Sequence, residues 1–129
     1  MPQNQSSGAA GNEFGRTTAP KIAASIGAKM VGRGSNEALW NGRRIVIKCA
    51  RSSTSSIGVT YRMLEYLDAV VAGFENPDGS FDLFELSPNM FKKLMSPTRS
   101  TGASSGRVGI VKRQAIRDSG KSLANVRLT

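Results

Sequence analysis

The sequence contains no histidine and only one cysteine, Cys49, among its 129 residues. Without these side chains the chain cannot form a histidine-based catalytic triad, a zinc finger or another site built from histidine and cysteine ligands. The single cysteine has no partner within the chain, which excludes a disulfide scaffold and fits a reducing cytoplasm. A hard cation such as Mg²⁺, held by carboxylate oxygens, is still compatible with the composition.

Long hydrophobic runs are also missing. No stretch approaches the roughly 20 apolar residues that a membrane-spanning helix requires, and the polar N-terminal residues lack the apolar core of a signal peptide. Apolar residues make up 39% and charged residues 21% of the chain, which is typical of a globular protein with some loose segments. We therefore expect a cytoplasmic protein without membrane contact and with one domain-sized core.

Acidic residues are scarce: nine Asp and Glu stand against eighteen Lys and Arg, which gives a net charge of +9. Such an excess favours a polyanionic partner, most often nucleic acid, and we expect double-stranded DNA. The acids are unevenly placed, because six of the nine lie within residues 65–85, where there is no Lys or Arg. The alternative interpretation is a basic surface without a nucleic-acid partner.

The order of the expected elements indicates an α/β (α+β) fold, a small mixed sheet with a central hairpin flanked by helices. Residues 1–16 are rich in Gly, Ser, Gln and Asn, and we expect a disordered or loose N-terminal arm there. Residues 17–113 are expected to form a single domain, and residues 114–129 a basic C-terminal tail. The expected elements are a helix over 17–30, strands on both sides of Asn41 and Gly42, a helix over 60–74, a strand over 80–86, a short helix from Pro88 and a strand over 107–111.

The strongest local signal is Asn41-Gly42 between two apolar runs, which predicts a tight hairpin turn. Residues 43–49 alternate as a half-buried strand, and Lys48 falls on the face opposite its isoleucines. An ammonium group is costly to desolvate without a partner, and Glu37 lies on the opposing limb of the same hairpin, where it could face this lysine. The alternative is a lysine whose head reaches water and an exposed glutamate.

This hairpin and the order of elements around it resemble the PD-(D/E)xK restriction-endonuclease-like superfamily. The text Gly-Arg-Gly-Ser-Asn-Glu-Ala over residues 32–38, then Asn41-Gly42, then Val46-Ile47-Lys48, is similar to the hairpin of small PvuII-type restriction endonucleases. The match covers residues 32–51. The resemblance implies a restriction-endonuclease-like core and a homodimer, since such enzymes cut the two strands of DNA as two-fold dimers.

The resemblance also implies site residues. Glu37 would be a metal-binding acid and Lys48 the catalytic lysine, with Mg²⁺ polarising the scissile phosphate and activating water. The chain departs from the family at Val46, where the second acid is expected two residues before the lysine. Either the site is dead, or Glu65 on the following helix supplies the missing metal ligand, with the backbone carbonyl of Ile47 as a further one. The alternative for Glu65 is a solvent-side residue of an amphipathic helix.

Nucleic-acid contacts are expected from arginines in loops or at the hairpin. These are Arg33, Arg43, Arg44, Arg51 and Arg99. The loop over residues 51–58 carries five hydroxyl side chains, which are suited to phosphate oxygens, although plain filler is the commoner role of such a loop.

Two classes of function follow. The first is a nucleic-acid-binding protein, either a Mg²⁺-dependent DNA endonuclease or a degenerate relative that binds DNA without cutting. The second is an interaction protein of phage or mobile-element type, which contacts protein partners through the acidic segment 65–85 and its basic ends.

Overall fold

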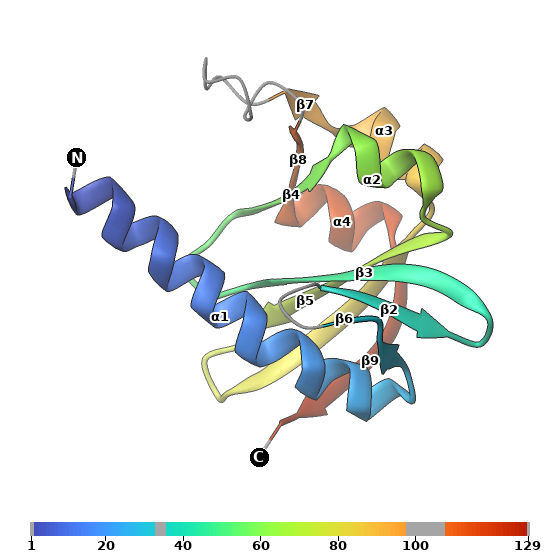
Figure 1. Ribbon diagram of the computed structural model, residues 1–129, viewed down its shortest axis with the longest axis horizontal. Helices are drawn as coiled ribbons and strands as arrows, with labels where there is room; N and C mark the ends of the chain where they lie inside the picture. The colour runs from blue at the N-terminus through green and yellow to red at the C-terminus, as the bar shows by residue number, and fades with distance from the viewer. Residues whose placement is uncertain (1, 33–35, 98–107, 129) are drawn as a thin grey trace.

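The computed structural model describes residues 2–32, 36–97 and 108–128 (Figure 1). In chain order the described elements are α1 (Pro2–Ile26), β1 (Lys29–Met30), β2 (Glu37–Trp40), β3 (Arg43–Ala50), β4 (Ser56–Thr60), α2 (Tyr61–Tyr66), β5 (Ala69–Glu75), β6 (Ser80–Leu86), α3 (Pro88–Leu94), β7 (Ser96–Pro97), β8 (Val108–Lys112), α4 (Arg113–Ser119) and β9 (Lys121–Arg127). They form a six-stranded sheet in the order β1-β2-β3-β5-β6-β9 and a three-stranded sheet in the order β4-β8-β7. The mixed α/β fold expected from the sequence is confirmed.

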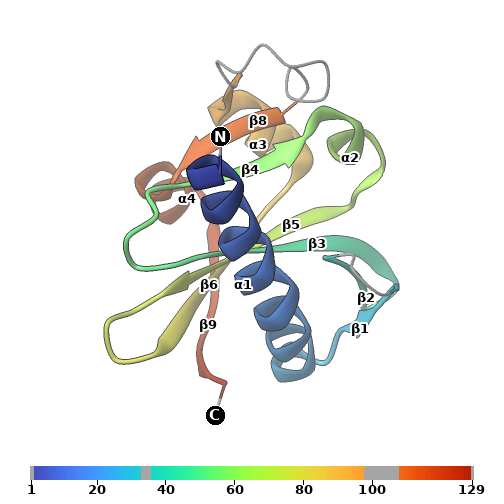
Figure 2. The same ribbon diagram turned by 60° about the vertical axis from the view of Figure 1, so that its left-hand side comes forward.

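The molecule has three layers, with the six-stranded sheet in the middle. Helix α1 runs along one face of this sheet, as Figures 1 and 2 show, and its Ile22 packs there against Ile45, Ile47 and other buried apolar residues. Gly73 of β5 lets the helix approach closely, because a Cβ at this position would come within 2.8 Å of the Ile22 Cδ1 atom. The three-stranded sheet and helices α2, α3 and α4 cover the opposite face of the six-stranded sheet.

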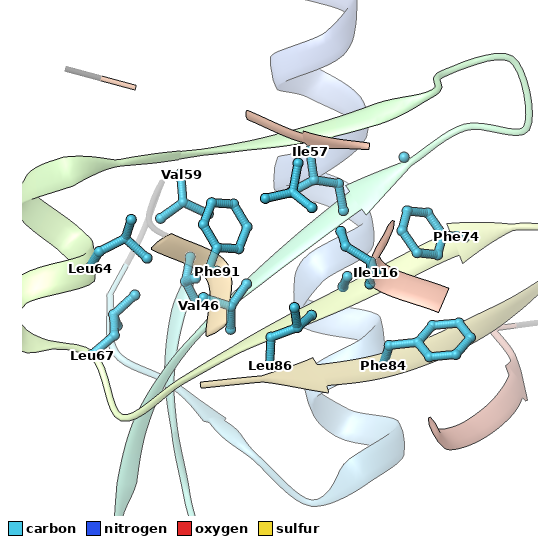
Figure 3. Close-up of a cluster of buried hydrophobic side chains, with 14 residues drawn as sticks. Val46, Ile57, Val59, Leu64, Leu67, Phe74, Phe84, Leu86, Phe91 and Ile116 are labelled. Atoms are coloured by element: carbon cyan, nitrogen blue, oxygen red, sulfur yellow. The ribbon is translucent and has the colours of Figure 1, made fainter. Parts of the chain in front are cut away.

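The core on that opposite face is drawn in Figure 3. Strands β4 and β8 and the three covering helices each contribute buried side chains: Ile57 and Val59 from β4, Leu64 from α2, Phe91 from α3, Val111 from β8 and Ile116 from α4. These pack on Val46, Phe74, Phe84 and other residues of the central sheet. The central sheet thus buries apolar side chains on both of its faces, whereas a sheet covered on one face only would bury them on that face alone.

The predicted hairpin is confirmed. Asn41 and Gly42 have φ angles of 53° and 78°, and they connect β2 to β3 with Trp40 opposite Arg43. Positive φ at both central residues gives a turn whose twist matches that of the flanking strands. Asn and Gly tolerate this backbone geometry, so four residues of local sequence are sufficient to set the register of the hairpin.

The helix predicted over residues 60–74 is wrong in its second half. Helix α2 ends at Tyr66, and residues 69–75 form strand β5. This strand lies parallel to β3 and antiparallel to β6, and its side chains from Ala69 to Phe74 are buried. A central strand buried on both faces is a continuous apolar run, and such a run also fits helical spacing.

Both ends of the chain differ from the expectation. Helix α1 begins at Pro2, within the segment predicted to be a loose arm, and the Phe14 ring stacks on Phe81 of β6 at 6.2 Å between centroids. The segment predicted to be a weakly patterned tail forms α4 and β9, and β9 pairs with β6 from Ser80 opposite Arg127 to Glu85 opposite Lys121. Backbone pairing at a sheet edge needs little apolar patterning, so no periodic pattern in residues 121–127 predicts this strand.

The remaining predicted elements are confirmed within a residue or two: strand β6, helix α3 with a side-chain cap from Ser87, and strand β8. Cys49 is half-buried on the face toward α1, and burial raises the pKa of its thiol to about 12, so it stays protonated at neutral pH. None of the described helices is long and apolar enough to cross a membrane.

Candidate nucleic-acid interface

Glu37 and Lys48 lie on the same face of the central sheet. Glu37 of β2 is directly opposite Val46 of β3, and directly opposite residues of an antiparallel pair share a face. Lys48 follows Val46 by two positions along β3, so it shares that face as well. The hairpin therefore places the two residues singled out in the sequence on one side, the side covered by α2.

The carboxylate of Glu37 has hydrogen-bond donors on both oxygens. Oε1 accepts a hydrogen bond from Arg44 Nε at 2.9 Å, and Oε2 accepts one from the Tyr66 hydroxyl at 2.7 Å. Partial burial raises the pKa of Glu37, but the hydrogen bonds from Tyr66 and Arg44 and the arginine charge outweigh this effect, so the pKa is lowered. The Arg44 guanidinium also lies over the Tyr66 ring, 5.5 Å from its centroid. These contacts fix Glu37 as an ionised anchor between the hairpin and α2.

Lys48 is half-buried, and none of the described carboxylates forms an ion pair with it. Its neighbour on β5 is Ala72, which offers no polar group. Burial lowers the pKa of the Lys48 ammonium, with only a small opposing effect from Cys49. Glu37 and Lys48 thus share a face without being joined to each other.

The structure does not gather the acids that a catalytic Mg²⁺ requires. Val46 is 0% exposed and belongs to the apolar core, where Figure 3 draws it with Leu64, Leu67 and Phe91. Glu65 is exposed on α2. Within the described ranges, no three Asp, Glu or Cys side chains are grouped so as to hold a metal ion. A hard cation prefers several free oxygen ligands, and Glu37 presents oxygens that already accept hydrogen bonds, so the residues present do not fit Mg²⁺.

The arginines predicted to contact nucleic acid have different surroundings. Arg43 forms a two-point ion pair with Glu85 and lies over the Trp40 ring, while Arg44 is bound to Glu37. Arg51 is exposed and lies over the Phe14 ring at 4.6 Å from its centroid. Arg33 and Arg99 lie outside the described residues. Of the described three, Arg51 alone has no acidic partner among the ion pairs of the described residues.

Three of the six acids in segment 65–85, namely Asp78, Asp82 and Glu85, form ion pairs within the fold. On β6 and the turn before it, Asp78 pairs with Arg127 at 3.0 Å and Asp82 with Arg117 at 3.2 Å. A hydrogen bond from Asn125 is the main cause that lowers the pKa of Asp82, and Arg117 contributes to it. The pairs form because α4 and β9, which carry these bases, pack on β6. Two bases near the C-terminus, Arg117 and Arg127, therefore pair with acids of the same chain.

A cavity that the sequence did not reveal lies between the loop after β3 and the junction of β8 with α4. It has a volume of about 280 Å³ and is lined by residues 52–55 and by Lys112, Arg113 and Gln114. The Arg113 guanidinium donates hydrogen bonds to the backbone carbonyls of Arg51, Ser52 and Thr54. The hydroxyl-rich loop was visible in the sequence, but the arginine that organises it comes from about 60 positions later, and no local pattern connects the two.

No family model matches the chain, and no curated protein matches it significantly.

Proposed function

We propose that the protein binds nucleic acid, on a restriction-endonuclease-like core whose catalytic position has lost its metal-binding acids, and that it does not cleave what it binds. The order of elements supports such a core, because helix α1, the β2–β3 hairpin, helix α2 and strand β5 occur in this order along the chain, with β1 and β4 as additional strands between them. Strand β5 then pairs in parallel with β3, the strand that carries Lys48.

The observation that carries the proposal is the distribution of the positive charge. Four arginines form ion pairs with acids of the same chain; these are Arg43, Arg44, Arg117 and Arg127. The net charge of +9 therefore resides largely in other cations. Among the described residues, the exposed Lys and Arg residues that form none of these ion pairs include Lys21, Lys29, Arg51, Arg62, Lys92, Lys93, Lys112 and Lys121. Cations without internal partners are available to phosphates.

The absence of cleavage follows from the buried Val46. The position at which the resemblance requires the second acid, Val46, lies in an apolar core. Neither remaining acid replaces it, because Glu37 already accepts hydrogen bonds from Arg44 and Tyr66, and Glu65 is exposed on α2. The competing interpretation, a protein-binding acidic patch, has less support because Asp78, Asp82 and Glu85 are paired internally. The homodimer implied by the resemblance stays a prediction.

Binding is tested by fluorescence anisotropy with double-stranded DNA, single-stranded DNA and RNA of equal length, over a series of salt concentrations. We expect log K to fall linearly with log salt, with a slope of about −0.9 for each phosphate contacted on duplex DNA. No binding to any of the three, or binding independent of salt, would contradict the proposal.

Cleavage is tested with the same DNA in the presence of Mg²⁺ or EDTA. We expect the DNA to remain intact in both. Mg²⁺-dependent cleavage that is lost in Lys48→Ala, but kept in the surface control Ser122→Ala, would show instead an active nuclease. Gel filtration with light scattering of the free and DNA-bound protein tests the dimer.

A further inference from the structure

We infer that the cavity formed by residues 52–55 with Lys112, Arg113 and Gln114 is a binding site for a phosphate group, occupied by the sugar-phosphate backbone of a bound nucleic acid. This inference rests on the proposed function for the identity of its occupant. The location of the site does not depend on the proposed function, since the residues that line the cavity define it.

The first argument is the set of donors on the loop. Four consecutive residues, Ser52 to Ser55, carry hydroxyl groups, and all four residues are exposed. None of these hydroxyls has a hydrogen-bond partner among the described residues, in contrast to the capping hydroxyls of Thr60 and Ser87. Hydroxyl groups are common positioning contacts to phosphate oxygens in nucleic-acid complexes.

The second argument is the charge of Arg113. Its guanidinium is held by three carbonyl oxygens of the loop and lies over the Phe74 ring at 5.2 Å from the centroid. No described carboxylate forms an ion pair with it, and its buried Nε has no hydrogen-bond partner there. Neutral carbonyls orient the guanidinium but leave its positive charge uncompensated. A fixed, partly buried charge of this kind attracts an anion more strongly than a fully hydrated one.

The third argument is how the loop is made rigid. The backbone N–H of Arg113 donates to the Ser55 carbonyl at 2.7 Å, and the Thr54 N–H donates to the Arg51 carbonyl at 2.9 Å. Together with the guanidinium contacts, these bonds fix the loop without using its hydroxyls. Lys112 is exposed, lines the same cavity and adds an ammonium group. A tetrahedral phosphate with several acceptor oxygens matches such a group of hydroxyl and ammonium donors.

One acidic group lies near the loop and opposes an anion. Glu75 Oε1 accepts a hydrogen bond from the Ser52 N–H at 3.4 Å. Its negative charge should weaken phosphate binding, so its removal should strengthen it. This gives the site a variant with an effect in the opposite direction, which general damage to the fold would not produce.

The experiment measures nucleic-acid affinity for the triple variant Ser53→Ala, Thr54→Ala, Ser55→Ala, for Lys112→Gln and for Glu75→Gln, with Ser122→Ala as the control for loss of an exposed hydroxyl. We expect the triple variant to bind about tenfold more weakly. The salt slope of Lys112→Gln should be smaller by about 1. Glu75→Gln should bind more tightly, and Ser122→Ala as the wild type does. Circular dichroism and thermal unfolding check that each variant is folded.

A titration of the ¹⁵N-labelled full chain with inorganic phosphate separates the site from the function. We expect phosphate to shift the amide resonances of residues 52–55, less so in Lys112→Gln, and equally in wild type and in Ser122→Ala. Such shifts in a chain that binds no nucleic acid would support the site and refute the proposed function. Full nucleic-acid affinity in the folded triple variant and in Lys112→Gln would refute the site and leave the proposed function standing.

Discussion

Arg43 at the start of β3 and Glu85 near the end of β6 form a two-point ion pair although 42 positions separate them in the sequence. Arg43 Nη1 lies 2.9 Å from Glu85 Oε2, and Nη2 lies 3.2 Å from Oε1. Trp40 lies against the guanidinium, and its indole N–H donates to the carbonyl of Ile26 at the end of α1. This relationship joins the hairpin, the far side of the sheet and the end of the long helix.

The Arg43–Glu85 pair should contribute measurably to stability. Its geometry is bidentate, but the two side chains are 38% and 19% exposed, so solvent reduces the effect. We expect a coupling free energy of about 1 kcal/mol in a double-mutant cycle of Arg43→Ala and Glu85→Ala, measured by urea unfolding. The pair Arg127–Asp78, whose side chains are 64% and 57% exposed, is the matched control and should show no measurable coupling. Equal coupling in both cycles would contradict the role of partial burial.

Stability should fall as the pH is lowered below the ordinary pKa values of Asp82 and Glu85. Those values are 3.8 for Asp82 and 4.5 for Glu85, and hydrogen bonds from Asn125 and from Arg43, respectively, lower both in the folded protein. The unfolded chain then binds more protons than the folded chain in this range. The stabilisation is therefore complete above the ordinary values and is lost as the pH falls through the folded ones.

Urea unfolding at a series of pH values from neutral downward measures this dependence. The double variant Asp82→Asn, Glu85→Gln should be less stable than the wild type at neutral pH, and its stability should change less between neutral and acidic pH. A difference between the two proteins that stays constant over this range would show that the lowered pKa values do not contribute.

Val46→Glu should destabilise the protein rather than restore a metal site. The side chain of Val46 is 0% exposed among apolar residues, so a carboxylate there would be buried without a partner. We expect a loss of about 3 kcal/mol or more at neutral pH, partly recovered at acidic pH when the new carboxyl group is protonated. Val46→Ala, which removes volume but adds no charge, is the control and should show no such recovery. A stable Val46→Glu variant that cleaves DNA with Mg²⁺ would contradict this account of the site.

Deletion of residues 121–129 should expose the edge of β6 and the apolar surface that β9 covers. Leu123 and Val126 pack on the core beneath α1, and the deletion removes them together with the backbone pairing. An uncovered strand edge promotes association between chains. We expect a lower thermal midpoint and aggregation in light scattering. The full-length variant Lys121→Gln, Arg127→Gln loses the charges but keeps the strand. It should stay monodisperse, and aggregation of this control would show that charge, not the strand, keeps the protein soluble.

The sequence alone was sufficient where structure depends on neighbouring residues. Asn41 and Gly42 set the turn and thereby the register that places Glu37 and Lys48 on one face, because few residue types accept positive φ at both positions. Ser87 and Pro88 likewise begin α3 through a local cap. The charge excess is a property of composition and needed no structure.

Tertiary structure decided what local patterns leave open. Residues 69–75 are a strand because β3 and β6 offer backbone partners on both sides, whereas their apolar pattern suits a buried helix equally well. Strand β9 exists because β6 has a free edge for it. The sequence also did not predict which residues bind Glu37, the acids on β6 and the loop at residues 52–55. Tyr66, Arg117 and Arg113 reach them only through packing between distant segments, and charge or hydroxyl content along the chain does not specify which groups will meet.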